Sequence, residues 1–487
     1  MPFNHLLFRR QFLLTQENCE HLAHWQCICF STFYLYAHPD IELTTIKNEN
    51  SNLNIVLLGY MIDPSNPTLS NTDILNKIPK LLQSIDRITD YLYNIAGRFV
   101  LIINNAIDTY IFHDPCGLRS VYYSKQNNKI NIGSQPHIFK YVIPLTPSKQ
   151  STTYNDSKYK ASTLEHWVPS GCSLYENIHH LLPNHYLKLS SCEPIRYWPN
   201  KKLISRKAND VAEEASTLLK NLLMAANNRF PLALSLTAGF DSRILLSACK
   251  NIANSIYFYT LQYRNLTLKS PDIKIPQILL NRLGFAHSVI DCRIVPEPDF
   301  IQIYKENVSL AHDNDWGHIA YGMLNSYDSS KVAIKGNVSE ICRCFYYKNG
   351  RHPLIKSPTQ LLKYERMWEQ IPFIREQISN WFKETKSVIE TTGINLLDLF
   401  YWEHRMGSWQ AQSQLEWDII QEAYTPFNHR GLLEILLSTS TRYRCAPDYL
   451  LYKKICKILW PEVLKEPINP QFFIKKWLKD LKYKLKQ

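Results

Sequence analysis

The sequence predicts a two-domain chain of class α/β plus α+β, in which an antiparallel β sandwich precedes a parallel-sheet domain with a helical C-terminal part. Residues 1–200 hold short apolar runs separated by Asn, Asp, Pro and Gly turns, as antiparallel sheets do. Residues 201–487 open with a helix-like segment that leads into a strand, a loop and a second helix, and then alternate between strand-like and helical segments. We place the domain boundary near 199–202, so the predicted domains are 1–200 and 201–487.

The composition is that of a globular protein with excess positive charge. Of 487 residues, 45% are hydrophobic, and the formal net charge is +12, which suits an anionic ligand or partner. No run of about 18 uncharged apolar residues occurs, and the N-terminal charges follow a short apolar patch, the reverse of a signal peptide. We therefore expect no transmembrane segment and a cytoplasmic location. The 12 cysteines contain no C-x-x-C pair, so we expect reduced thiols rather than a zinc site or disulfides.

Four apolar runs of the first domain are predicted strands. They lie at 54–60, 98–103, 109–112 and 120–123. A polar segment at 150–165 is predicted to be a loop inside this domain. Strands of this length and spacing favour an antiparallel sheet in two layers.

The second domain is organised around residues 231–243. An apolar run to Leu236 is followed by turn residues and by a helix from Ile244, which is how a nucleotide-binding βα unit begins. A tight loop there directs backbone N–H groups and the positive end of the helix dipole at one point. The segment predicts a phosphate site, although an ordinary strand-to-helix turn with an N-cap also fits it.

The alternation continues downstream of this loop. Further strands are predicted at 255–260, 287–291 and 332–335, and helices at 208–228 and 272–283, with helical structure again from Leu361 onward. Parallel strands bring their carboxyl ends to one edge of the sheet, where ligands bind. We expect ATP at this edge, in contact with Ser235, Thr260 and Gly336.

The loop at 237–242 lacks the usual phosphate-loop patterns, but it resembles the S-G-G-x-D-S loop of the ATP pyrophosphatases. The resemblance implies that Thr237, Gly239 and Ser242 hold pyrophosphate and that Asp241 binds Mg²⁺. Ala238 stands where that loop has glycine. If this position needs a positive φ, alanine strains the loop by about 1 kcal/mol.

Segments along the whole chain resemble the asparagine synthetase-like superfamily, which also includes β-lactam synthetases and lasso-peptide cyclases. Those that resemble its glutaminase domain are 96–99 with 114–123, 132–134 and 182–185; those that resemble its synthetase domain are 336–346 and 422–434. The resemblance implies an Ntn-hydrolase-like β sandwich followed by an ATP-pyrophosphatase domain.

The glutaminase chemistry of that superfamily is not expected here. Its nucleophile is a cysteine that becomes residue 1, with its α-amine as the base. This chain has Pro2 at that place, and Cys19, Cys27 and Cys29 are internal. We expect the first domain to be a retained scaffold without glutaminase activity.

The resemblance also assigns roles at the synthetase site. Glu340 matches the acidic metal ligand, so it would hold Mg²⁺ together with Asp241, and Arg243 would add positive charge. Ile468 stands at the position of a lysine that stabilises developing charge, and Lys465, one helical turn earlier, is the predicted substitute. A capped helix start is the alternative for Glu340, and a solvated surface position is the alternative for Lys465.

These observations predict an ATP-dependent ligase that adenylates a carboxylate of a small molecule or peptide and releases pyrophosphate. Ammonia or an amine would then form the amide. One alternative is a pseudoenzyme with a binding or regulatory role; another is an RNA-modifying ATP pyrophosphatase, against which the absence of an RNA-binding motif argues. A homodimer is left open. The basic segment 474–487 is expected to dock on the domain, with contact to a membrane or an acidic partner as the alternative.

Overall fold

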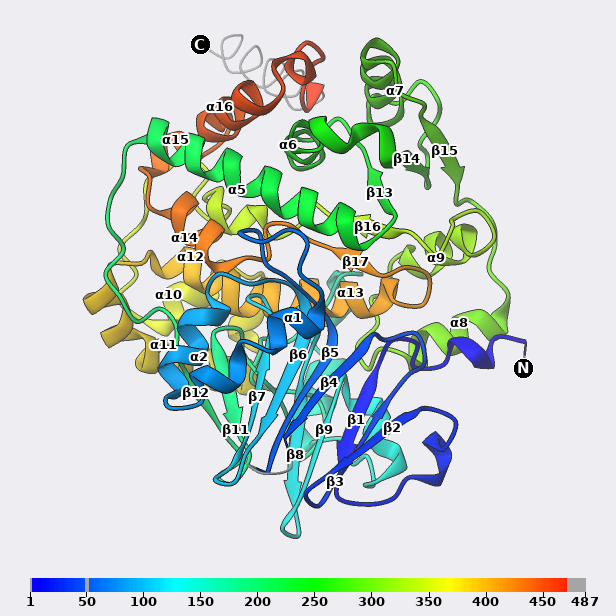
Figure 1. The fold of residues 1–487 in the computed structure, drawn as a ribbon, viewed down its shortest axis with the longest axis vertical. Helices are drawn as coiled ribbons and strands as arrows, with labels where there is room; N and C mark the ends of the chain where they lie inside the picture. The colour runs from blue at the N-terminus through cyan, green and yellow to red at the C-terminus, as the bar shows by residue number, and fades with distance from the viewer. Residues whose placement is uncertain (1, 49–51, 471–487) are drawn as a thin grey trace.

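The computed structural model describes residues 2–48 and 52–470 (Figure 1). Two six-stranded antiparallel sheets are followed by a five-stranded parallel sheet with helices on both sides. The predicted fold class is therefore confirmed. The basic segment 474–487 lies outside the described residues.

The first sheet of the sandwich has the order β10-β8-β9-β1-β3-β2 and the second has the order β12-β11-β7-β6-β5-β4. The strands of the first are β1 (Phe12–Thr15), β2 (Gln26–Phe30), β3 (Phe33–Ala37), β8 (Tyr122–Gln126), β9 (Lys129–Gly133) and β10 (Ile178–His180). Those of the second are β4 (Leu43–Asn48), β5 (Leu53–Ile62), β6 (Ala96–Asn104), β7 (Thr109–His113), β11 (His185–Lys188) and β12 (Glu193–Arg196). Leu14, Val56 and Val100 belong to the apolar layer between the sheets.

Three predicted strands of this domain lie within β5, β6 and β7, and the fourth begins two residues late. The late start follows from Asp114, whose carboxylate accepts the backbone N–H groups of Leu118 (2.9 Å) and Arg119 (2.9 Å) and folds the chain into a turn before β8. Helices α1 (Asn71–Leu75) and α2 (Ile85–Leu92) pack on the outer face of the second sheet.

The polar segment 150–165 was predicted to be a loop, and that prediction is wrong. It contains most of α3 (Lys149–Asn155) and all of α4 (Lys158–Ser162). Tyr154 and Tyr159 are buried in the main core and anchor the two short helices. Because most residues of this segment are polar, its sequence pattern did not indicate that the two tyrosines are buried.

The parallel sheet has the order β15-β14-β13-β16-β17. Its strands are β13 (Leu232–Ser235), β14 (Ile256–Gln262), β15 (Ser288–Asp291), β16 (Val332–Ile334) and β17 (Ala423–Tyr424). Four of them lie where the sequence predicts strands. The fifth, β17, has two residues, too few to leave a periodic signal.

Helices cover both faces of this sheet. The helices of residues 201–470, not all of which touch the sheet, are α5 (Ala208–Arg229), α6 (Phe240–Ala248), α7 (Pro271–Leu283), α8 (Pro298–Glu306), α9 (Trp316–Leu324), α10 (Pro358–Leu362), α11 (Pro372–Thr392), α12 (Leu396–Phe400), α13 (Ala411–Trp417), α14 (Arg430–Leu437), α15 (Thr441–Arg444) and α16 (Leu450–Leu459), with a π-helix at Tyr401–Gln410. The predicted helices at 208–228 and 272–283 correspond to α5 and α7, and α7 ends at Gly284 in the left-handed conformation.

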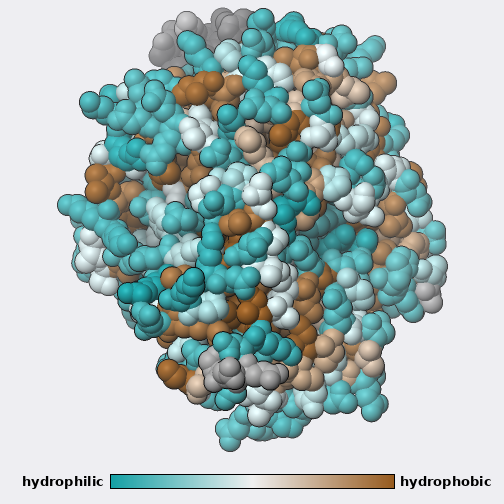
Figure 2. Space-filling view, viewed as in Figure 1, coloured by the Kyte–Doolittle hydropathy of each residue, from teal (hydrophilic) through white to brown (hydrophobic). Residues whose placement is uncertain are grey.

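Hydrophilic residues cover most of the face shown in Figure 2, with apolar patches between them. In the part of the chain that the structure describes, no helix is both long and apolar enough to span a bilayer. All twelve cysteines are unpaired.

Buried ion pairs join the two domains. The guanidinium of Arg98 on β6 donates to both carboxylate oxygens of Asp418 (2.5 and 2.7 Å) and to Glu422 (2.9 Å). Arg119 donates to the other oxygen of Glu422 at 2.9 Å. The Arg98 and Asp418 side chains are at most 2% exposed. The segments that resemble the glutaminase signature therefore form a domain contact here.

Removing Asp418 should cost the protein much of its stability. The buried guanidinium of Arg98 would stay charged, but only Glu422 would remain as its carboxylate partner. We expect Asp418→Ala to lower the free energy of unfolding by about 3 to 5 kcal/mol, measured by urea denaturation. The matched control is Lys201→Ala, which removes the exposed pair with Asp90 (3.4 Å) and should cost less than about 1 kcal/mol. Equal losses in the two variants would contradict this account of the interface.

The short edge strand β17 is also bound to the first domain. The Tyr60 hydroxyl donates to the Ala423 carbonyl at 2.6 Å. Asn428, a few residues later, donates to the Gly97 carbonyl (2.9 Å) and to Asp114 (2.7 Å). Segment 422–434 therefore fixes the sheet edge against the sandwich.

Candidate nucleotide site

The loop between β13 and α6 is closed on itself by side-chain hydroxyls. Ser242, in the first turn of α6, accepts the Thr237 N–H (3.1 Å) and donates to the Thr237 carbonyl (3.2 Å). The N–H of Gly239, the N-cap residue of α6, donates to the Thr237 hydroxyl at 3.2 Å. The residues assigned to pyrophosphate are thus brought together, and in this state their hydroxyls shape the loop.

Neighbouring segments hold the backbone of Ala238. Its N–H donates to the Asp272 carboxylate of α7 (3.1 Å), and its carbonyl accepts the Asn469 N–H (2.8 Å). Ala238 does not have a positive φ, so the condition for strain at this position is not met. The bond to Asp272 shows that this loop amide donates to an anionic group.

Asp241 and Glu340 come together at the start of α6, as the sequence predicts, with a guanidinium between them. Asp241 accepts the Ser339 hydroxyl (2.5 Å) and the Arg343 guanidinium (2.9 Å), and the same Arg343 nitrogen lies 3.3 Å from Glu340. The other oxygen of Glu340 is buried and has no hydrogen-bond partner among the described residues. Burial, and next the charge of Asp241, raises the pKa of Glu340 to about 7.

This carboxylate pair could hold a divalent cation. Mg²⁺ is usually bound by one or two carboxylates together with phosphate oxygens and waters, and the unpartnered oxygen of Glu340 is a free ligand atom. No group of three or more His, Cys, Asp or Glu side chains suited to a metal occurs within 2–48 and 52–470. Asp241 and Glu340 therefore fit a metal ion that is also bound by nucleotide phosphates. Without a metal, the guanidinium of Arg343 offsets the charge of the two carboxylates.

The chain between β16 and these acids is tightly constrained. A Cβ at Gly336 would lie 2.7 Å from the Asp241 Cβ, so only glycine fits against the loop. Val338 is buried with a φ of 77°, a conformation that β-branched residues rarely adopt. Such strain is found where surrounding structure fixes functional groups.

Arg243 is not free to contact a phosphate in this structure. Its guanidinium donates to the carbonyls of Val463 (2.5 Å), Glu466 (2.9 Å) and Pro467 (3.3 Å) and is buried. Arg243 therefore fixes the C-terminal segment beside the loop. Lys465 is exposed on that segment.

Ser235 ends β13, and Thr260 lies two residues before the end of the neighbouring strand β14. Thr260 donates its hydroxyl to the Leu236 carbonyl (2.8 Å) and shares a hydrogen bond with His287 (2.8 Å). Ser235 lies beside Tyr259 across the β13–β14 pair. Both residues lie next to the loop between β13 and α6, and the hydroxyl of Thr260 holds the backbone at the start of that loop.

Lys335, which no motif of the sequence indicates, follows β16 directly. Its ammonium lies 5.3 Å from the centre of the Trp417 ring, and burial lowers its pKa to about 8. A lysine at the end of a short apolar strand, just before Gly336, could have indicated a cation at this edge of the sheet. It was missed because a lysine at a strand end is usually solvated.

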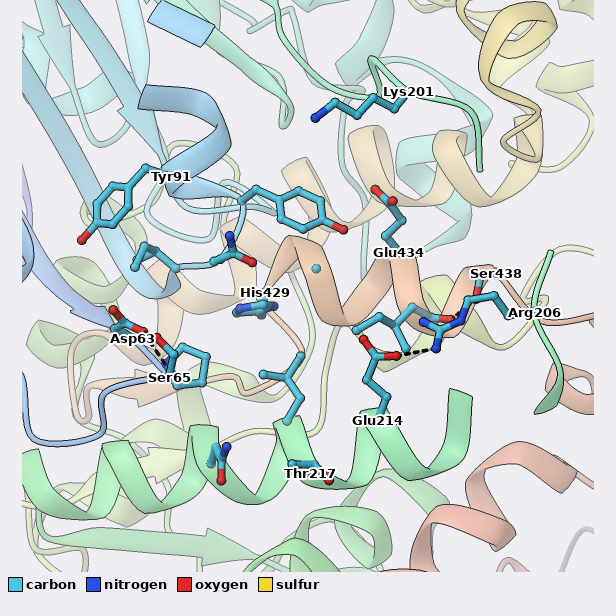
Figure 3. A pocket seen from close by; sticks show the side chains of 18 of the residues that line it. Asp63, Ser65, Tyr91, Lys201, Arg206, Glu214, Thr217, His429, Glu434 and Ser438 are labelled. Atoms are coloured by element: carbon cyan, nitrogen blue, oxygen red, sulfur yellow. Dashed lines mark hydrogen bonds and ion pairs between the residues drawn. The ribbon is translucent and has the colours of Figure 1, made fainter. Parts of the chain in front are cut away.

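A cavity of about 930 Å³ lies away from this loop, between α2, α5 and α14 (Figure 3). Two of its acids have basic partners, since Asp63 pairs with Lys77 (3.1 Å) and Glu214 with Arg206 (2.5 Å). None of the residues 235–242 or 335–343 lines it. Its size alone does not make it the nucleotide site.

No protein-family model matches the chain, and no curated protein matches it. Solved structures with a partial likeness include the allosteric regulatory enzyme of purine biosynthesis (11% identity, TM-score 0.24, 59% of this chain and 70% of that one). Glutamine phosphoribosylpyrophosphate amidotransferase from B. subtilis, complexed with ADP and GMP, is another (11%, 0.23, 61% and 65%). A third is glutamine-dependent NAD⁺ synthetase from Acinetobacter baumannii with ADP (10%, 0.21, 41% and 43%). At these scores the likenesses assign no function.

Proposed function

We propose that the chain is an AMP-forming carbon–nitrogen ligase of the asparagine synthetase-like kind. The observation that carries the proposal is the pair Asp241 and Glu340 at the end of the loop, with an unpartnered carboxylate oxygen and a cation beside it. The motif resemblances along the chain support it. ATP and a carboxylate are the proposed substrates.

In the first half-reaction a carboxylate oxygen of the acid attacks the α-phosphorus of ATP. The bond from that phosphorus to the oxygen bridging to the β-phosphorus breaks, and pyrophosphate leaves with its electrons. Loop amides and the hydroxyls of Thr237 and Ser242 would bind the departing phosphates, and Arg343 would offset their charge. When bound, Mg²⁺ would supply further positive charge, held by Asp241 and Glu340.

In the second half-reaction the nitrogen of ammonia or an amine attacks the carbonyl carbon of the acyl-adenylate. The carbon–oxygen bond to AMP breaks, and the nitrogen loses a proton to solvent. We expect no supply of ammonia from glutamine, because burial raises the pKa of the Cys19 and Cys27 thiols and so disfavours a thiolate nucleophile.

Product analysis tests this proposal directly. We expect the protein, given ATP, Mg²⁺ and a panel of amino-acid and peptide carboxylates, to exchange labelled pyrophosphate into ATP and, with ammonia, to form AMP. Exchange dependent on one class of acid would identify the substrate. ADP and phosphate as products would contradict the assignment.

The pseudoenzyme is the second candidate function, and one observation favours it. Arg343 already contacts both carboxylates, so the protein has its own cation where a metal would bind. A role without turnover predicts ATP binding, measured by equilibrium dialysis, that is independent of Mg²⁺ and accompanied by no exchange. The ligase predicts tighter binding with Mg²⁺.

A further inference from the structure

Two exposed thiols lie close together on the outermost strand of the first sheet. Cys27 and Cys29 belong to β2, which ends the strand order β10-β8-β9-β1-β3-β2. Both cysteines are exposed, and neither forms a disulfide. Figure 1 shows β2 at the rim of the sandwich, away from the parallel sheet. The two thiols are therefore accessible to solutes and take no part in the proposed ligase reaction.

The two side chains share one face of the strand. Residues i and i+2 of a strand point to the same side of the sheet, and Ile28, between them, packs against the core of the sandwich. Cys27 and Cys29 therefore face away from that core, next to Tyr36 and Tyr34, their partners on β3. The two thiols share a hydrogen bond, and the Tyr36 hydroxyl forms another with Cys27. The sulfur atoms are thus turned toward each other.

The strand spacing suits a metal ion better than a disulfide. Two residues of an extended strand span about 6.4 to 6.8 Å, the upper limit for the Cα atoms of a disulfide, whose Cβ atoms must also approach to about 3.5 to 4.5 Å. Side chains on one face of a strand run nearly parallel, so their Cβ atoms stay too far apart for that bond. A cation held by two thiolates at about 2.3 Å each needs the sulfur atoms only about 4.6 Å apart.

The charges also favour a cation between the thiols. Partial burial, and next the charge of Cys29, raises the pKa of the Cys27 thiol, because two neighbouring thiolates repel each other. A cation bound to both sulfur atoms removes that repulsion and displaces their protons. Binding of a cation thus allows both thiols to ionise.

The number of ligands decides which cation fits. Structural Zn²⁺ takes four ligands, and iron–sulfur clusters are held by four cysteines. Within 2–48 and 52–470, no three His, Cys, Asp or Glu side chains are grouped to hold a metal, so the pair has no third ligand of these kinds there. Thiolates select soft Cu(I), which two of them can bind in a linear arrangement. Cu(I) is therefore the cation that suits this pair.

We propose that Cys27 and Cys29 form a two-coordinate site for Cu(I) at the edge of the sandwich. Each thiol gives up one proton to solvent, and each sulfur donates an electron pair to the ion. Copper stays monovalent, so no oxidant or reductant takes part. The site is independent of the ligase function proposed above, and its exposed position lets another thiol compound deliver or remove the ion by exchange.

Competition with bicinchoninate, a chromophoric chelator of Cu(I), tests the proposal on the full chain without oxygen. We expect the protein to remove one equivalent of Cu(I) from the chelator, and X-ray absorption to show two sulfur neighbours around copper. Cys27→Ser and Cys29→Ser should each weaken binding by more than about 100-fold, since even the loss of an outer-shell partner costs up to that much.

The control is Cys192→Ser, which replaces a half-buried cysteine of the same domain and should leave Cu(I) binding unchanged. The unfolding midpoints of all four proteins should agree, because both ligands lie on an exposed strand. Binding that survives either Cys27→Ser or Cys29→Ser, or a third sulfur neighbour around copper, would overturn the proposal, as would Cu(I) left entirely with the chelator. The absorption spectrum of the wild type decides the case even where a variant loses its fold.

Discussion

Asp241→Asn is expected to abolish pyrophosphate exchange, with a loss of at least 100-fold to 1,000-fold. The carboxylate accepts the Ser339 hydroxyl and contacts the Arg343 guanidinium. A neutral amide keeps the size of the side chain but gives up its charge, so both the cation beside it and a metal held with Glu340 would lose their partner. The change leaves the fold intact because Asp241 is partly exposed.

The control for this experiment is Asp299→Asn. Asp299 also lies in the first turn of a helix, α8, but on an element away from the loop. Isotope exchange and the unfolding midpoint should be measured for both variants. Retained exchange in Asp241→Asn with a normal midpoint would refute the role of this carboxylate, and a loss in Asp299→Asn would show that any first-turn aspartate matters.

Acidification from pH 7 to pH 5 is expected to unfold the protein or lower its unfolding temperature steeply. Burial lowers the pKa of seven histidines to about 3 or 4; they are His38, His113, His166, His180, His185, His404 and His429. Their unfolded pKa is about 6.5, so the unfolded chain binds more protons in the window between. Stability is therefore full above pH 6.5 and is lost as the pH falls toward 4.

At pH 5 each such histidine lowers the free energy of unfolding by about 2 kcal/mol relative to neutral pH, and the losses of all seven together rival the whole stability of a typical domain. His404→Phe isolates one contribution, because His404 packs between Trp381 and Phe400 with both ring nitrogens unpartnered. This variant should show a shallower fall of unfolding temperature with pH. His24→Phe, which replaces an exposed histidine, should leave the fall of unfolding temperature with pH unchanged. Equal slopes of unfolding temperature against pH in the two variants would contradict the prediction.

Periodicity and turn residues were sufficient to predict the layers of this fold. The loop, the helix after it and the meeting of Asp241 with Glu340 could be predicted because parallel strands bring their ends to one edge. The strand β17 could not, since Ala423–Tyr424 is too short for a pattern and depends on contacts with a distant domain.

The charges of the site were harder to predict than its backbone. Arg243 follows the loop directly in sequence, yet the helix turns its guanidinium toward the carbonyls of 463–467. Arg343 contacts both acids from a segment that follows the left-handed residue Val338, a conformation that the sequence does not reveal. Sequence neighbours do not show which way a side chain on a new helix will point, and this direction decides which cation is free.

The contact between the domains bears on whether the second could exist without the first. Tyr60, Arg98 and Arg119 of the first domain hold the strand and acids that border the parallel sheet. Deleting the sandwich would leave Asp418 and Glu422 facing each other without their cations. The first domain thus serves as a support for the second, and this role rests on the few residues of that contact.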